Sequence, residues 1–189
     1  MDSDLKQLSD EDLVRVFKEG RRKAFDELYG RYAARLKRLI YYYLGNAEES
    51  SDVLHDVFLR VFMHINSFKT DMVFSSWIYK IAVNCSKNFK RKYRYEVMLG
   101  DSDQLIAEGV ASEDSPEEQF LKQEDMKALY EAVGSLKDKF REVFLLRFDH
   151  GLQYGQISAI LNCPERTAKW RMQKAVEKIV DRLKDEKIV

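Results

Sequence analysis

The sequence is poor in the residues that tight turns and covalent cross-links require. Two of its 189 residues are proline and eight are glycine, which argues against an all-β chain with many turns. Its two cysteines, Cys85 and Cys163, lie far apart, each within an apolar helical pattern. We therefore expect neither a disulfide framework nor a zinc site, and infer a reducing cytosol.

Long apolar runs are missing as well. No stretch approaches the roughly 20 apolar residues that span a bilayer, and the acidic start, Met1 to Asp4, has no secretory apolar core. We therefore expect a soluble, cytoplasmic protein without membrane insertion. Apolar residues still make up 45% of the chain, enough for a core in one or two small domains.

An excess of charge of one sign is also absent, since 32 basic residues balance 32 acidic ones. This balance excludes a uniformly basic coat for nucleic acid. The charges are nevertheless segregated: residues 77–94 hold six bases and no acid, whereas residues 95–126 hold ten acids and one base. With its glycines, serines and proline, the stretch 96–116 is predicted to be a flexible acidic linker.

Apolar residues recur at helical spacing on both sides of this linker, and no strand-like alternation is long enough for a sheet. The predicted fold class is therefore all-α, with two small helical domains at residues 10–95 and 117–185. Local signals mark helix ends. Ser9 is a predicted N-cap, Gly45-Asn46 and Gly134-Ser135 predict breaks, and Ser75 or Ser76 is expected to cap a helix after a loop at 66–75.

The second domain contains the pattern of a helix-turn-helix. A short helix at 156–161 and a tight turn at 162–164 precede a longer helix with a basic, polar face. Arg, Lys and Gln on such a helix can read base edges in the major groove. The candidate DNA-binding residues are Arg166, Thr167, Lys169, Trp170, Arg171, Gln173 and Lys174. A merely solvated face is the alternative, and the order of the elements favours duplex DNA.

The first domain has a second candidate site, where aromatic residues adjoin a wholly basic helix. Aromatic faces stack on unpaired bases while cations follow phosphates, so this combination favours single-stranded or melting DNA. Taken alone, Phe74 and Trp77 are more simply explained as core residues. The candidate residues are Phe68, Phe74, Trp77, Lys80, Asn84, Lys87, Asn88 and Arg91.

These motifs resemble, in order and spacing, a bacterial RNA polymerase sigma factor of the extracytoplasmic-function (ECF, sigma-70 group 4) family. The resemblance covers about residues 10–185. The start of the family's region two resembles residues 24–32, and its polymerase-clamp segment resembles residues 52–58. The promoter-melting segment of region two resembles residues 74–78 and 81–84. Region four resembles residues 136–147, Ile157 and residues 167–171.

The chain departs from the family pattern at four positions. His55 stands where Gln is usual, Lys137 where Pro follows Leu, and Gln156 where Glu is usual. The recognition helix usually has a small residue at the position of Trp170. An indole at that position could stack on a sugar or meet a thymine methyl group rather than hydrogen-bond to a base edge.

The resemblance implies a non-catalytic factor, with no cofactor and no metal, that binds core RNA polymerase and promoter DNA. Residues 66–75 would capture an extruded base of the minus-ten element, and the helix at 166–174 would read the minus-thirty-five element. An anti-sigma factor would bind the same apolar faces as polymerase. The implied polymerase contacts are Asp52, Leu54, His55, Asp56, Phe58 and Leu59.

Two other classes compete with this interpretation. A one-component helix-turn-helix regulator would bind duplex DNA without polymerase, but its sensor domain would not need the basic helix at 77–94. A helical-bundle metalloenzyme would use Asp52 and His55 on one helix face, but such sites require a second carboxylate–histidine pair, and the sequence shows none.

Overall fold

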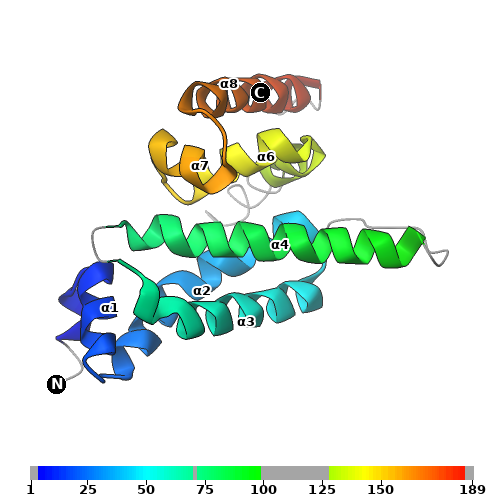
Figure 1. Ribbon diagram of the computed structural model, residues 1–189. Coiled ribbons are helices and arrows are strands. Elements are labelled where there is room, and N and C mark those ends of the chain that lie inside the picture. The colour runs from blue at the N-terminus through cyan, green and yellow to red at the C-terminus, as the bar shows by residue number, and fades with distance from the viewer. Residues whose placement is uncertain (1–3, 70–71, 99–127, 186–189) are drawn as a thin grey trace, which may run out of the picture. The chain divides into compact units, whose positions relative to one another are not determined.

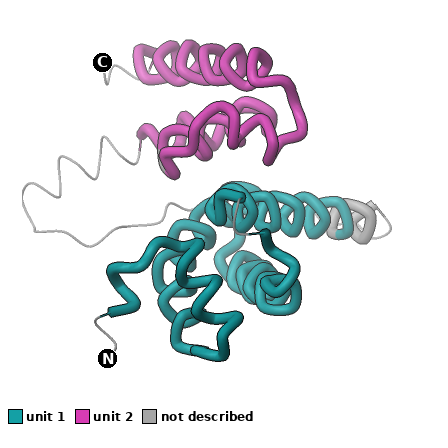
Figure 2. The backbone as a smooth tube through the Cα atoms, turned by 60° about the vertical axis from the view of Figure 1, so that its left-hand side comes forward, with its two compact units in different colours: residues 1–105 teal, residues 106–189 magenta. Residues whose placement is uncertain are grey.

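The computed structural model describes residues 4–69, 72–98 and 128–185. The chain divides into two compact units, residues 1–105 and 106–189 (Figure 2). The described residues form helices and connections without a strand, which confirms the predicted all-α class. The domain limits at 10–95 and 117–185 stay predictions, and residues 99–116 of the predicted linker lie outside the described part.

Unit 1 is a helical bundle. Its elements are η1 (Leu5–Gln7), α1 (Asp10–Lys18), α2 (Lys23–Leu44), α3 (Ala47–His64), η2 (Ile65–Ser67) and α4 (Phe74–Met98). Helices α2, α3 and α4 pack against one another, and α1 packs mainly on α2. Figure 1 shows α3 and α4 running antiparallel, joined at the end of the unit where α1 lies.

Local sequence signals explain most of the helix ends in unit 1. The Ser9 hydroxyl accepts the N–H of Asp12 at 3.1 Å, as an N-cap does. Gly45 ends α2 with a left-handed φ of 74°, and Asn46 accepts the N–H groups of Glu48 and Glu49 to begin α3. The predicted N-cap at Ser9 and the predicted break at Gly45-Asn46 are confirmed, and the cap by the Asn46 side chain is an addition to that prediction.

The start and the end of α4 differ from the sequence prediction. The helix begins at Phe74, so Ser75 and Ser76 lie inside it and neither is the N-cap. The N–H of Phe74 is instead bonded to the carboxylate of Glu11, 63 residues away, at 2.8 Å. At its other end α4 continues to Met98, three residues into the predicted linker.

Unit 2 holds a helix at 128–135 followed by α6 (Asp138–Phe144), the π-helical turn η3 (Leu145–Asp149), α7 (Tyr154–Leu161) and α8 (Glu165–Asp185). Helices α6 and α7 both pack on α8. The first helix continues through Gly134-Ser135, so the break falls at residues 136–137, directly after the predicted position. Arg141 donates to the carbonyl oxygens of Leu136 at 2.6 Å and Val133 at 3.2 Å, which stabilises that helix end.

Both cysteines are free thiols, Cys85 buried in α4 and Cys163 half-buried in the turn before α8. Burial raises the pKa of the Cys85 thiol above its ordinary value. Within the described segments, no helix has both the length and the apolar character needed to cross a bilayer.

Candidate nucleic-acid and protein interfaces

Helices α7 and α8 form the predicted helix-turn-helix. Asn162 turns the chain with a left-handed φ of 50°, and the Ser158 hydroxyl donates to the carbonyl of Cys163 at 2.6 Å. The Gln156 side chain accepts the N–H of Gln153 at 2.8 Å. Because an amide oxygen accepts this bond as a carboxylate would, glutamine serves as a capping residue at this position.

None of the predicted recognition residues belongs to the buried stripe of α8, which consists of Ala168, Ala175 and Ile179. Trp170 is 48% exposed, and its ring lies 5.9 Å from that of Phe140. A large aromatic surface is therefore presented to solvent on this helix. Of the other candidates, Arg166, Lys169 and Gln173 are exposed, and Thr167, Arg171 and Lys174 are half-buried.

Two of the candidate lysines, Lys169 and Lys174, form ion pairs with acidic residues of α8 itself. Lys169 bonds to Glu165 at 2.7 Å, and Lys174 bonds to Glu177 at 2.6 Å. Gln173 also donates to Glu177, at 3.1 Å. The hydrogen bond from Lys174 lowers the pKa of Glu177 below its ordinary value. The sequence prediction missed Glu177, although its spacing of three from Lys174 is a signal for such a pair.

Tyr154 connects the two helices of the motif through its ring. The Arg147 guanidinium lies 5.1 Å from the ring centroid and the Lys169 ammonium 5.7 Å from it, both within reach of a cation–π interaction. Together with Glu165, this ring orients Lys169 at the first turns of α8.

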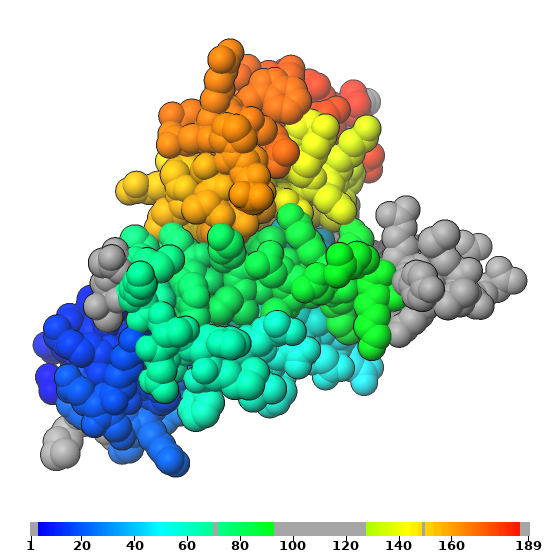
Figure 3. Space-filling model, in the orientation of Figure 1, coloured from blue at the N-terminus to red at the C-terminus, as the bar shows by residue number. Residues whose placement is uncertain are grey.

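The predicted basic face of α4 is present on the surface of unit 1. Its exposed members recur every three or four residues and so share one side of the helix. From Phe74 to Lys92 the helix holds five cations and no acid. In Figure 3, α4 crosses the visible face of unit 1 as a continuous exposed strip. The exposed candidates are Lys80, Asn84, Lys87, Asn88 and Arg91.

The structure buries two of the aromatic DNA-binding candidates, Phe68 and Phe74. Phe74 is fully buried and Phe68 is 4% exposed. Their rings pack against each other at 5.6 Å and against half-buried Trp77 at 5.7 and 5.1 Å. A ring enclosed by other side chains has no face on which a base can stack, so of the three only Trp77 has surface to offer DNA.

The polymerase-contact candidates fall into two groups on α3. Asp52, His55, Asp56 and Leu59 are exposed, whereas Leu54 and Phe58 are 8% and 6% exposed and pack toward α2. The exposed stripe continues to Phe62 and Met63, which are 51% and 57% exposed. The sequence prediction did not include Phe62 or Met63 among the polymerase contacts, although the repeat of three and four residues from His55 through Leu59 leads to both.

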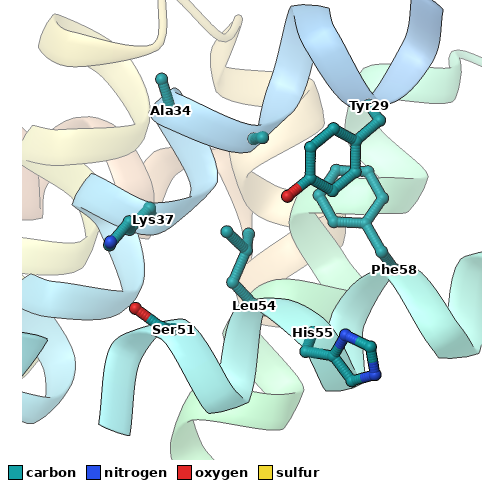
Figure 4. A pocket seen from close by; sticks show the side chains of 8 residues that line it. Tyr29, Ala34, Lys37, Ser51, Leu54, His55 and Phe58 are labelled. Atoms are coloured by element: carbon teal, nitrogen blue, oxygen red, sulfur yellow. The ribbon is translucent and has the colours of Figure 1, made fainter. Parts of the chain in front are cut away.

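Leu54 and Phe58 line a pocket of about 360 Å³ between α2 and α3. Figure 4 shows the rings of Tyr29 and Phe58 side by side, with His55 nearby on α3 and Lys37 farther along α2. The pocket combines an aromatic wall with polar groups, as protein-binding surfaces do.

The alternative of a metal site at Asp52 and His55 requires further ligands close to these two side chains. In residues 4–69, 72–98 and 128–185, no group of three or more His, Cys, Asp or Glu side chains is placed to hold a metal ion. Asp52 and His55 are instead exposed on the α3 stripe.

Comparisons with known protein families match both units. A model described as sigma-70 region 2 matches residues 28–95, and one described as sigma-70, region 4 matches residues 126–179. The two matches define a chain of the sigma-70 class with both regions. Among curated relatives, the ECF RNA polymerase sigma-E factor of Escherichia coli K12 is 31% identical over 179 residues, covering 92% of this chain and 93% of its own.

The corresponding factor of Haemophilus influenzae is 28% identical and covers 94% of this chain and 96% of its own. The chain therefore belongs to the ECF family of RNA polymerase sigma factors. Two solved structures share the fold. CnrH in complex with the cytosolic domain of CnrY has a TM-score of 0.69 at 19% identity, over 93% of this chain and 97% of that one.

The second is the sigma factor RpoE of Bartonella quintana in complex with the anti-sigma factor NepR. It has a TM-score of 0.71 at 21% identity, over 86% of this chain and 98% of that one.

Proposed function

We propose that this sigma factor binds core RNA polymerase in the cytoplasm and directs it to promoters by recognising a minus-ten and a minus-thirty-five element and assisting DNA melting. The observation that carries the proposal is the exposed face of α4, with five cations and no acid between Phe74 and Lys92. A sensor domain of a duplex-binding regulator has no use for such a face.

The α4 face suits a single strand in the process of melting. Lys80 and Arg91 attract phosphates, Asn84 and Asn88 supply hydrogen-bonding amides, and the half-buried indole of Trp77 supplies an aromatic surface at the start of the helix. Unstacking a base costs a few kcal/mol, and one stacking contact returns about 1–3 kcal/mol. The contacts on this face are thus of the size required to hold an extruded base.

Helix α8 suits a closed duplex. Its exposed Arg166 and half-buried Arg171 can make bidentate contacts to guanine, and Trp170 can meet a thymine methyl group or a sugar. Lys169 and Lys174 are oriented by acids of the same helix. We assign this face to the minus-thirty-five element.

The exposed stripe of α3 is the proposed polymerase contact. It combines Asp52, His55 and Asp56 with Leu59, and continues to Phe62 and Met63. An anti-sigma factor is proposed to compete for these side chains, since one structural neighbour of this chain, RpoE, is described in complex with an anti-sigma factor.

The proposal is tested by run-off transcription with purified core polymerase and genomic promoter fragments. We expect new start sites that appear only when this chain is added. Binding of the chain alone to duplex DNA, with no association with core polymerase and no new start site, would favour the one-component regulator.

A further inference from the structure

Two side chains of α1 bond to the two sides of the connection between η2 and α4. The Lys18 ammonium donates to the carbonyl oxygen of Phe68 at 2.6 Å, and the Glu11 carboxylate accepts the N–H of Phe74 at 2.8 Å. Glu11 and Lys18 are about two helical turns apart and therefore leave the same face of α1. One face of one helix thus holds both sides of this connection.

Helix α1 is itself fixed to the rest of unit 1. Arg31 of α2 donates to the Asp10 carboxylate at 2.8 Å and to the Leu8 carbonyl at 2.9 Å, and the Tyr32 hydroxyl also donates to Asp10. Leu13 is fully buried. Figure 1 shows α1 at the end of the unit where α3 passes into α4. The helix can therefore act as a fixed support for that end.

The two bonds fix the backbone at both ends of the aromatic cluster formed by Phe68, Phe74 and Trp77. The Phe74 N–H belongs to the first turn of α4, where backbone donors lack helical partners and a carboxylate is electrostatically favourable. Phe68 and Phe74 each pack on Trp77. Because the backbone is fixed at Phe68 and Phe74, the indole of Trp77 is also fixed at the N-terminal end of the basic face of α4. A receptor fixed before binding loses less entropy when its ligand arrives.

We propose that Glu11 and Lys18 are positioning residues for minus-ten recognition, which hold Phe68 and Phe74, and with them Trp77, where the extruded base is received. This inference rests on the proposed function. Neither residue lies on the α4 or α8 faces, so neither is required to touch DNA.

The test uses reconstituted holoenzyme with Glu11→Ala or Lys18→Met, on a promoter that the wild-type chain uses and on the same promoter with its minus-ten bases changed. The quantity measured is the ratio of initiation on the two templates. We expect each variant to lower this ratio about tenfold, equivalent to about 1.4 kcal/mol. Glu11→Gln keeps an acceptor oxygen and Lys18→Arg keeps a donor, so both should restore the ratio.

Matched controls are Lys6→Met and Glu19→Ala, which remove exposed charges beside α1 and should leave the ratio unchanged. Co-elution with core polymerase and circular dichroism verify that each variant is folded. If Glu11→Ala unfolds, the exposed Lys18 decides the outcome. A folded Lys18→Met variant with an unchanged ratio overturns the inference and leaves the proposed function intact. A wild-type chain that directs no start site overturns both.

Discussion

The two helices assigned to DNA, α4 and α8, place their aromatic residues and their acids differently. At the start of α4 the ring of Phe74 is buried, and no acid follows before Lys92. On α8 the indole of Trp170 is exposed, and Glu165 and Glu177 bond to lysines of the same helix. From Phe74 to Lys92, α4 thus carries charge of a single sign and its first ring is buried, whereas α8 carries mixed charge around an exposed ring.

This difference separates two ways of binding DNA. Charge of one sign attracts phosphates irrespective of sequence, whereas side chains held in fixed directions select base edges. We therefore expect α4 variants to alter salt dependence and melting, and α8 variants to alter sequence preference on closed duplex. The predictions below test this contrast, beginning with the largest effect.

The largest effect is expected from truncating the buried ring. Phe74→Ala should lower the free energy of unfolding of unit 1 by about 3–5 kcal/mol, because it removes a buried aromatic side chain. Trp170→Ala should cost less than about 1 kcal/mol, because half of its ring is already in solvent. Urea unfolding followed by far-ultraviolet circular dichroism measures both. Equal losses would show that the two aromatics have the same role.

The next effect is expected on α8. Arg171→Ala combined with Lys174→Ala should weaken holoenzyme binding to a promoter with an intact minus-thirty-five element by at least about tenfold, since a good base contact is worth about 1–3 kcal/mol. On a template with that element scrambled, the loss should be smaller, because only the attraction of the two charges to phosphates is removed. Unchanged binding to the intact promoter would contradict the assignment of α8.

A smaller change is expected on α4. Lys80→Ala combined with Arg91→Ala should weaken promoter binding several-fold and reduce the dependence of log affinity on log salt by roughly 0.7 per charge removed from a single-strand contact. A series of binding titrations in potassium chloride measures the slope. Lys6→Met, which removes an exposed charge elsewhere in unit 1, is the control and should leave the slope unaltered.

The smallest effect concerns Glu177. Glu177→Gln removes a negative charge beside Lys174 and should strengthen binding to any duplex by about twofold. Because Lys174 lowers the pKa of Glu177, the pair is complete above the ordinary carboxyl range and is lost as pH falls through the lowered pKa. Titration of the Glu177 carboxyl carbon by NMR should therefore show a midpoint below 4.5, moving upward in Lys174→Ala. An identical midpoint in both proteins would contradict the pairing.

Local signals allowed the sequence to predict part of this structure. Ser9, Gly45 and Asn46 act on backbone groups within a few residues, so their effects could be predicted without tertiary contacts. The start of α4 could not be predicted in this way, because the carboxylate that caps it belongs to Glu11, which is far away in the sequence. The preference of serine for the N-cap position predicted Ser75 or Ser76 as the cap of α4, but the packing of α1 against this end of α4 supplies Glu11 instead.

The candidate sites show the same division. Helical spacing placed Lys80, Asn84 and Arg91 on one exposed face of α4, because spacing determines which residues share a face. It could not show that Phe68 and Phe74 are buried, since an aromatic residue beside a basic helix suits either a core or a binding surface. The burial of Phe74 depends on tertiary packing, in which the ring of Tyr32 from α2 lies 5.5 Å from that of Phe74.

The central claim, that the two helices bind separate parts of one promoter, is tested most directly by photo-crosslinking. A photoreactive amino acid is placed at Asn84 of α4 or at Trp170 of α8 in reconstituted holoenzyme on an open promoter. We predict crosslinks from position 84 to the melted non-template strand and from position 170 to closed duplex farther upstream. Crosslinks from both positions to the same duplex segment, or from neither position to DNA, would contradict the account.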